Sequence, residues 1–130
     1  MNKKIIFSSG GTGGHIFPAL GLIGYFLNKD YEVVLVTDAR GSKYANKFNK
    51  IRKYIIKTDT PTNKNIFKKI ISFIVIFFSV IRSIFILRKE KPDLVFGLGG
   101  YVSFPISFAS KILGIPLVIY ENNFRYSTGL

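Results

Sequence analysis

Short apolar runs alternate along this chain with longer segments in which apolar residues return every three or four positions. The short runs predict β-strands, and the longer segments predict amphipathic helices. We expect strands at residues 5–8, 31–37, 55–56, 94–96 and 117–120. We expect helices at residues 18–27, 45–51, 66–87 and 105–113. Almost wholly apolar strands that alternate with helices indicate a Rossmann-like α/β fold, a parallel sheet with helices on both faces.

Prolines help to set the bounds of these helices. Pro18 suits the first turn of a helix, where its missing N–H costs nothing. Pro92 closes the long helix, because the residue before a proline, Lys91, avoids helical backbone.

Three polar clusters directly follow predicted strands, at residues 10–15, 97–103 and 121–123. In open parallel sheets, ligands bind at the carboxyl ends of the strands. We therefore expect the three clusters to meet at one edge of the sheet and to form an active site there.

The first cluster is a glycine-rich loop, Gly-Gly-Thr-Gly-Gly at residues 10–14. Such a loop presents backbone N–H groups and a helix dipole to a phosphate, and a Cβ would keep a diphosphate away from the backbone. A P-loop is excluded because no Gly-Lys-Ser/Thr follows. A dinucleotide loop is disfavoured because Gly-x-Gly-x-x-Gly is not matched and only Asp38 stands near the position of a ribose-binding acid. A tight turn without a ligand is the alternative.

His15 is the only histidine of the chain and stands where this loop enters its helix. A neutral imidazole can accept a proton from an attacking hydroxyl, and the neighbouring phosphate-binding loop favours that role. The alternative is a structural or surface histidine.

The second cluster repeats the order of strand, glycine turn and helix, and it offers Tyr101 and Ser103 as hydrogen-bond donors. Its alternative is a glycine-packed crossover with a serine cap before Pro105. The third cluster, Glu121-Asn122-Asn123, could orient sugar hydroxyls, although strand exits rich in asparagine are also ordinary turns.

Composition narrows the kinds of site. With no cysteine, one histidine and seven acidic residues among 130, we expect neither disulfides nor a metal site. The apolar run at residues 5–7 is too short for a signal peptide, so we expect the protein to stay in the cytoplasm. The net charge of +12 implies attraction to nucleic acid, a phosphorylated substrate or acidic lipid.

Basic residues crowd the middle of the chain, just before its most apolar segment, residues 70–81. They are Lys43, Lys47, Lys50, Arg52, Lys53, Lys57, Lys64, Lys68 and Lys69. This order favours an anionic membrane surface over nucleic acid, for which the interleaved aromatic and basic residues of a known module are missing. The segment falls short of the roughly 20 residues of a span unless Arg82 snorkels, so we expect peripheral attachment. A solvated lysine-rich face and a buried helix are the alternatives.

Several motifs stand in a fixed order along the chain. They are residues 10–19 (Gly-Gly-Thr-Gly-Gly-His-Ile-Phe-Pro-Ala), Lys91-Pro92-Asp93, Gly99-Gly100-Tyr101-Val102-Ser103, Leu113-Gly114-Ile115-Pro116 and Glu121-Asn122-Asn123. In these motifs, over essentially its whole length, the chain resembles the MurG family. Members of that family transfer N-acetylglucosamine from UDP-GlcNAc to undecaprenyl-pyrophosphoryl-MurNAc-pentapeptide, which converts lipid I to lipid II. The resemblance implies the amino-terminal half of a two-domain GT-B glycosyltransferase that inverts configuration and needs no metal ion or cofactor.

The resemblance also assigns roles to residues. It makes His15 the candidate catalytic base. It also implies a set of residues that contact UDP-GlcNAc: Thr12, Gly13, Gly14 and Asn123. It puts on the acceptor side Gly99, Gly100, Tyr101, Ser103 and Glu121. The family's usual His-Glu-Gln-Asn is Tyr120-Glu121-Asn122-Asn123 here, which weakens any role for the first and third positions. The implied reaction is attack of the MurNAc C4 hydroxyl on the anomeric carbon of GlcNAc, while loop N–H groups stabilise the departing UDP.

The family continues beyond the length of this chain. We expect residues 1–130 to form an incomplete acceptor- and membrane-binding domain at the cytoplasmic face of the bacterial inner membrane, without the carboxyl-terminal donor domain. The chain is then a fragment, a truncated gene product, or one subunit of a split transferase whose partner chain supplies the donor domain. A non-catalytic membrane-recruiting subunit is the alternative function, and nucleic acid is not an expected partner.

Overall fold

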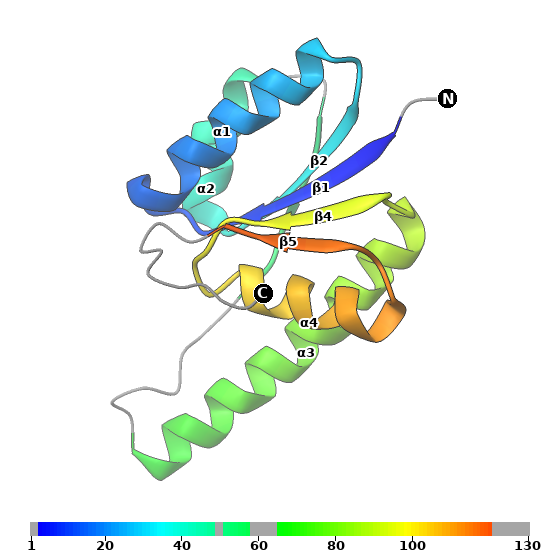
Figure 1. The fold of residues 1–130 in the computed structure, drawn as a ribbon. Helices are drawn as coiled ribbons and strands as arrows, with labels where there is room; N and C mark the ends of the chain where they lie inside the picture. The colour runs from blue at the N-terminus through cyan, green and yellow to red at the C-terminus, as the bar shows by residue number, and fades with distance from the viewer. Residues whose placement is uncertain (1–2, 49–50, 58–64, 121–130) are drawn as a thin grey trace.

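A parallel sheet with the strand order β3-β2-β1-β4-β5 lies at the centre of the protein (Figure 1). The computed structural model describes residues 3–48, 51–57 and 65–120. Its strands are β1 (Lys4–Ser9), β2 (Glu32–Thr37), β3 (Arg52–Ile55), β4 (Leu94–Gly97) and β5 (Leu117–Ile119). Each strand overlaps or adjoins a predicted one.

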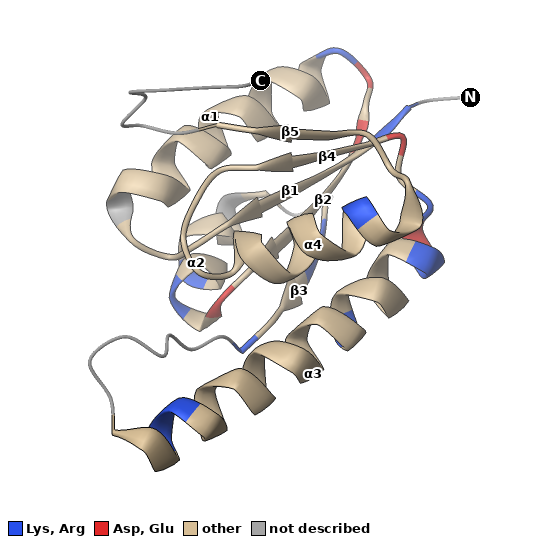
Figure 2. Ribbon diagram, turned by 60° about the horizontal axis from the view of Figure 1, so that its bottom comes forward, with Lys and Arg blue, Asp and Glu red and all other residues tan. Residues whose placement is uncertain are grey.

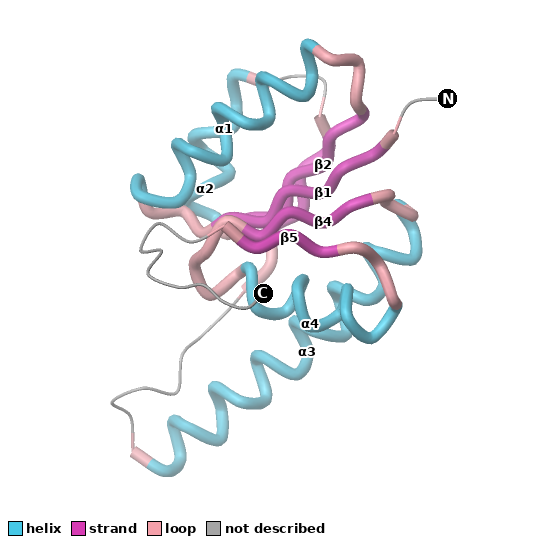
Figure 3. Tube along the Cα trace, in the orientation of Figure 1, coloured by secondary structure: helices cyan, strands magenta, loops and turns pink. Residues whose placement is uncertain are grey.

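Helices cover both faces of this sheet (Figure 3). On one side lie α1 (Gly13–Asn28), α2 (Ala39–Tyr44) and the short 3-10 turn η1 (Ala45–Lys47). On the other lie α3 (Ile66–Glu90) and α4 (Ser103–Leu113), and the amino-terminal half of α3 extends past the sheet (Figure 1). The Rossmann-like fold predicted from the alternation of apolar segments is confirmed.

Side chains of β1 point alternately into two cores. Phe7 packs with Ile23 of α1 on one face, and Ile6 packs with Leu87 of α3 and Ile106 of α4 on the other. All five are at most 1% exposed. The strand is apolar on both faces because each face is covered, as in other parallel sheets.

The first helix begins earlier than predicted. It starts at Gly13, so Pro18 lies inside the helix and not in its first turn. The Thr12 carbonyl accepts from the N–H groups of His15 and Ile16, at 3.0 and 2.9 Å, and this starts the helix within the glycine-rich loop. Ile16 is 0% exposed, and its burial helps to offset the poor helix propensity of the glycines.

The polar helix predicted at residues 45–51 is wrong, because α2 ends at Tyr44 and the described residues that follow form the 3-10 turn η1 and no α-helix before β3. Asp38 starts α2: its Oδ1 accepts from the Gly41 N–H at 2.9 Å. An acidic residue ahead of a helix is a recognised start signal, so this helix could have been identified from the sequence.

The long helix ends where its proline predicts. It runs to Glu90, and Lys91 then takes left-handed backbone with a φ of 50° ahead of Pro92. The left-handed turn brings the Lys91 N–H to the Leu87 carbonyl at 2.9 Å, which closes the helix.

Candidate functional site

Two glycine-rich loops meet at the carboxyl ends of β1 and β4. The Gly10 N–H donates to the Gly99 carbonyl at 3.1 Å, and the Leu98 N–H donates to the Ser8 carbonyl at 2.8 Å. The predicted convergence of the first two polar clusters is therefore confirmed. The glycine-rich loop is defined from here on as residues 10–14, and the second loop as residues 98–102.

Both loops need glycine where they touch. Gly99 and Gly100 have φ values of 95° and 82°, a backbone that other residues rarely adopt. A Cβ on Gly100 would stand 2.8 Å from the Gly10 Cα, and a Cβ on Gly99 would stand 2.7 Å from the His15 Cδ2. The missing side chains let the second loop lie against the first loop and against the His15 ring.

His15 forms a hydrogen bond with Thr12. The Thr12 Oγ1 and the His15 Nδ1 lie 2.8 Å apart, and either atom can be the donor, depending on the imidazole tautomer. Thr12 precedes α1 in the capping position, yet its hydroxyl makes no cap to the helix backbone. The hydroxyl that usually caps a helix is here used to hold the imidazole.

Tyr101 and Ser103 differ in exposure. Tyr101 is 60% exposed, whereas Ser103 is 8% exposed. The Ser103 hydroxyl lies within donating distance of the Gly99 carbonyl at 2.7 Å and the Ser8 carbonyl at 3.0 Å. These contacts hold the second loop on β1, so Ser103 supports the structure of the site. Its contact with the acceptor substrate stays a prediction.

The third predicted cluster, Glu121-Asn122-Asn123, lies outside the described residues. The preceding Tyr120 donates its N–H to the Gly97 carbonyl at 2.8 Å. The chain therefore leaves β5 at the same edge of the sheet as the two loops.

Asp38 supports the glycine-rich loop, a role that the sequence did not reveal. Its Oδ2 accepts from the Gly11 N–H at 3.1 Å while its Oδ1 caps α2. The Arg40 Nη2 lies 3.6 Å from the same Oδ2. The Asp38 carboxylate therefore links the end of β2 to the glycine-rich loop. Because both of its oxygens are used in this way, Asp38 is not a candidate ligand for a ribose.

A pocket of about 630 Å³ opens between the glycine-rich loop and α2. Its lining residues are Gly11, Thr12, Arg40, Lys43 and Tyr44. The Tyr44 ring meets the Phe17 ring edge-on, with 5.3 Å between centroids. The pocket thus combines an aromatic wall with two cationic side chains beside the loop.

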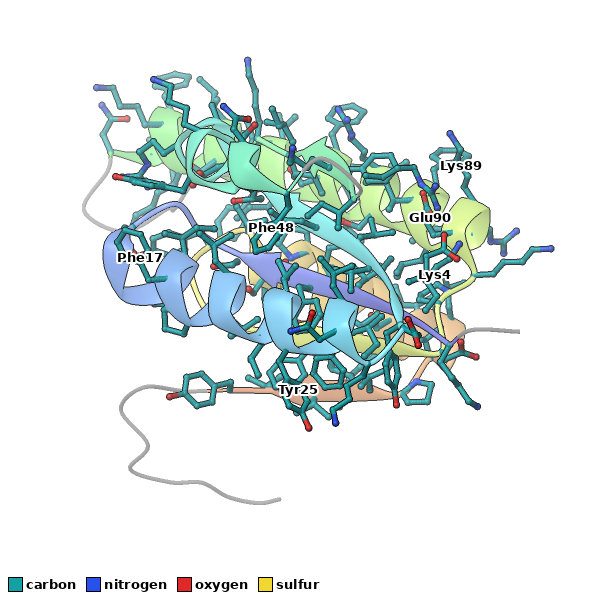
Figure 4. The ribbon with its side chains drawn as sticks, turned by 90° about the horizontal axis from the view of Figure 1, so that it is seen from above. Lys4, Phe17, Tyr25, Phe48, Lys89 and Glu90 are labelled. Atoms are coloured by element: carbon teal, nitrogen blue, oxygen red, sulfur yellow. The ribbon has the colours of Figure 1, made fainter. Side chains whose placement is uncertain are left out.

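Among the described residues, most of the side-chain ion pairs gather at the opposite end of the sheet, where the strands begin. Glu90 is 3% exposed, and its carboxylate accepts from Arg52, Tyr54 and Lys4 at 2.5 to 3.1 Å. The Arg52 guanidinium, helped by Tyr54 and Lys4, lowers the pKa of Glu90 from 4.5 to about 2. Burial, followed by the Glu90 carboxylate, raises the pKa of Tyr54. Figure 4 shows Lys4 and Glu90 together at one end of the sheet and Phe17 at the other, so this cluster stabilises the fold away from the site.

The outer face of α3 is apolar and exposed. Nine large side chains on it are 49% to 75% exposed: Ile66, Phe67, Ile70, Ile71, Phe73, Ile74, Phe77, Phe78 and Phe85. Neighbouring α4 adds Phe104, Phe108 and Ile112, each about half exposed. We call this set the apolar face.

Serines occupy buried positions of the same helix: Ser72, Ser79 and Ser83. The Ser79 hydroxyl donates to the Lys57 carbonyl, and the Ser83 hydroxyl donates to the Ser79 carbonyl at 2.8 Å. The usual order of a surface helix, apolar inside and polar outside, is therefore partly reversed.

Lysine and arginine stand at both ends of α3, with Arg82 between them (Figure 2). Among the described residues, Ile66–Glu90 is the helix long and apolar enough to cross a membrane, with a mean hydropathy of 2.7 over its most apolar stretch. Core helices of soluble proteins pass the same test, but only 28% of this stretch is buried. Burial in a protein core therefore does not account for its composition.

Comparison with known proteins places the chain in a family. The glycosyltransferase family 28 N-terminal domain matches residues 5–128. A Wolbachia protein (sp. subsp. Brugia malayi), named UDP-N-acetylglucosamine--N-acetylmuramyl-(pentapeptide) pyrophosphoryl-undecaprenol N-acetylglucosamine transferase, is 37% identical over 92% of this chain and 32% of its own length. The protein of that name from Blochmanniella floridana is 40% identical over 93% of this chain and 34% of its own length.

The crystal structure of Acinetobacter baumannii MurG has the same fold, with a TM-score of 0.80 at 27% identity over 92% of this chain and 35% of that one. The chain spans about a third of the length of the curated relatives that it matches. The sheet order, the two glycine loops and the match across residues 5–128 agree: this chain belongs to the MurG family within glycosyltransferase family 28, and it corresponds to the N-terminal domain of that family.

Proposed function

We propose that this chain is the acceptor- and membrane-binding half of a peptidoglycan N-acetylglucosaminyltransferase. The enzyme transfers GlcNAc from UDP-GlcNAc to the C4 hydroxyl of undecaprenyl-pyrophosphoryl-MurNAc-pentapeptide. The names of the relatives supply this donor and this acceptor. The observation that carries the proposal is the Thr12–His15 pair, held between two glycine loops at the carboxyl edge of the sheet.

In this proposal His15 is the base. The C4 oxygen of MurNAc attacks the anomeric carbon of GlcNAc from the side opposite UDP, so the new C–O bond forms as the bond to the UDP oxygen breaks. Configuration at that carbon inverts. The hydroxyl proton passes to the His15 Nε2, which must then carry a lone pair. A ring whose Nδ1–H donates to the Thr12 Oγ1, across the observed 2.8 Å, meets this requirement.

The departing UDP carries negative charge on its diphosphate. The amino end of α1 begins in the glycine-rich loop, and Thr12, Gly13 and Gly14 are our donor-side contacts. Oriented backbone dipoles stabilise such charge as it develops, and in this proposal they do so without a metal ion. Asn123 belongs to the same donor-side set.

The acceptor lies on the side of the second loop. We assign to it Gly99, Gly100, Tyr101, Ser103 and Glu121. Tyr101 is 60% exposed and is assigned to the sugar or peptide of the acceptor, while Ser103 acts by holding the loop. The donor domain, on the same polypeptide or on a partner chain, closes over this edge.

The apolar face rests in the cytoplasmic leaflet of the inner membrane. Aromatic and aliphatic side chains bury in the acyl boundary, and the basic residues at the ends of α3 meet anionic headgroups. A spanning arrangement would surround the helix with lipid, yet Ile86 and Leu87 of α3 belong to the core beneath the sheet. Peripheral attachment therefore fits the packing, and it brings the lipid-linked acceptor to the two loops.

The test is a transfer assay with UDP-GlcNAc and a lipid I analogue. The chain is combined with the donor half of a relative such as Acinetobacter baumannii MurG, either mixed or fused. We expect transfer that needs both halves. His15→Ala should lower kcat by about 10²–10⁴-fold, the usual contribution of a positioned base. Asn28→Ala, at the far end of α1, is the matched control and should leave the rate unchanged.

Two outcomes would change the proposal. Full activity of His15→Ala in an active pair would remove His15 as the base. An inactive pair whose acceptor half still binds membranes would favour the alternative function, a non-catalytic subunit that recruits a partner to the membrane.

A further inference from the structure

The pocket beside the glycine-rich loop has the charge of an anion site. Arg40 and Lys43 both line it, and the Arg40 Nη2 lies 3.6 Å from the Asp38 Oδ2. Both Asp38 oxygens already accept backbone N–H groups, from Gly11 and Gly41. Among the described residues Lys43 has no carboxylate within ion-pair distance, so the pocket keeps a positive excess.

Thr12 belongs both to this pocket and to the pair with His15. It is one of the residues that line the pocket, and its Oγ1 lies 2.8 Å from the His15 Nδ1. The other side of the ring faces Gly99, where a Cβ would stand 2.9 Å from Nε2. The imidazole thus lies between the hydroxyl of a pocket residue and the Gly99 backbone, at a place that a side chain on residue 99 would crowd.

We propose that the pocket binds a diphosphate group through Arg40 and Lys43, and that the Thr12 hydroxyl couples this binding to the tautomer of His15. A hydroxyl has one proton and can donate it in one direction at a time. In the empty pocket the Thr12 hydroxyl is able to donate to Nδ1, and the neutral ring then carries its proton on Nε2. A diphosphate oxygen in the pocket accepts that hydroxyl proton, so Nδ1 becomes the donor to Oγ1.

The consequence for chemistry rests on the proposed function. With Nδ1 protonated, the lone pair is on Nε2, and Nε2 is the atom that takes the proton of the attacking hydroxyl. The bound diphosphate would thus set the base before the reaction begins. Arg40 and Lys43 are binding residues, and Thr12 is a positioning residue that acts through His15.

Because His15 is the only histidine, NMR of the ¹⁵N-labelled imidazole reports this state without ambiguity. The chain is titrated with inorganic pyrophosphate while long-range ¹H–¹⁵N spectra follow Nδ1 and Nε2. We expect the signals to move toward the Nδ1–H tautomer as the pocket fills. Thr12→Val should bind pyrophosphate without this tautomer change, and Thr12→Ser should restore it.

The Arg40→Ala/Lys43→Ala double variant should weaken pyrophosphate binding at least tenfold. The matched control is Lys29→Ala/Lys111→Ala, which removes the same charge from exposed positions outside the pocket and should bind nearly as the parent chain. Equal affinity of the two double variants would overturn the assignment of the pocket. A tautomer unchanged at saturation, or one that changes equally in Thr12→Val, would overturn the coupling.

Two further ligands distinguish the sources of the diphosphate. UDP-GlcNAc, the donor, and a short prenyl diphosphate, which stands for the acceptor, are each added to the pyrophosphate-loaded chain. The ligand that displaces pyrophosphate and keeps His15 in the Nδ1–H tautomer identifies the source of the diphosphate. These spectra do not depend on transfer. Failure of the coupling is therefore separate from failure of the transferase assay.

Discussion

At the scale of single residues, the site depends on space that glycines leave open. Gly99 and Gly100 let two loops approach until backbone atoms and the His15 ring almost touch. The close approach of Gly99 to the His15 ring, which a side chain on residue 99 would prevent, keeps the imidazole next to Thr12. We therefore expect stability and imidazole position to change together when this space is filled.

The variant Gly99→Ala tests this. The alanine backbone must adopt a φ of 95°, and its methyl group must displace the His15 ring. Gly114→Ala meets a φ of 71°, but no heavy atom lies within 4 Å of the added methyl group. Strained backbone costs about 1–3 kcal/mol at either position. We expect Gly99→Ala to lose clearly more unfolding free energy in urea and to shift the His15 NMR signals. Equal losses with unchanged His15 signals would mean that the close approach has no energetic weight.

Residue types in this site were more predictable from the sequence than their contacts. Glycines after a strand and a histidine at a helix start are local patterns, and they identified the loop. The Thr12–His15 bond was not predicted, because a threonine ahead of a helix is expected to cap the backbone. The brace from Asp38 to Gly11 joins residues 27 positions apart, and no local pattern reports such a pair.

At the scale of elements, α3 differs most from an ordinary surface helix. Its apolar side chains are exposed, and its serines are buried. Its length and end were predictable because apolar composition and a proline are local signals. The start of α1 was not, because tertiary burial of Ile16 overrides the low helix propensity of the glycines before it.

Phe77→Asp should weaken binding to anionic vesicles about tenfold or more, since burial of a large apolar side chain contributes about 1.5–3 kcal/mol. Phe77 is 62% exposed, so the fold should tolerate the change. Tyr25→Asp is the matched control: this ring is 56% exposed and belongs to α1, which lies on the opposite side of the sheet from α3 (Figure 1). Flotation with and without anionic lipid, at low and high salt, measures the effect. Binding that depends on neither lipid charge nor salt would contradict the account.

At the scale of the whole molecule, the two ends of the sheet, where its parallel strands begin and where they finish, have different roles. The loops at the carboxyl edge are joined by backbone hydrogen bonds and are open to ligands. At the amino edge, Glu90 of α3 joins Lys4 of β1 and Arg52 and Tyr54 of β3. Much of the tertiary electrostatic stabilisation thus lies far from the chemistry.

Acid should therefore unfold this protein through Glu90. Its pKa is lowered from 4.5 to about 2 by the Arg52 guanidinium. A lowered folded-state pKa contributes stability that is complete above pH 4.5 and is lost as the pH falls toward 2. Up to about 3 kcal/mol is involved.

Unfolding free energy measured between pH 7 and pH 2.5 tests this, with Glu90→Gln less stable at neutral pH but flatter in the acid range. Glu32→Gln is the matched control, because Glu32 also pairs with Arg52 but its side chain is 45% exposed. The same acid profile in Glu90→Gln and the parent chain would assign acid sensitivity to other groups.

The reversed polarity of α3 has a consequence for anyone who improves this protein for laboratory use. Screens for expression and solubility reward polar residues on exposed positions, and here those positions hold Phe73, Phe77 and Phe85. Each gain in such a screen would remove contact area for lipid. Selection for a well-behaved protein in water would therefore select against membrane binding, a trade-off between stability and function that is concentrated on one helix.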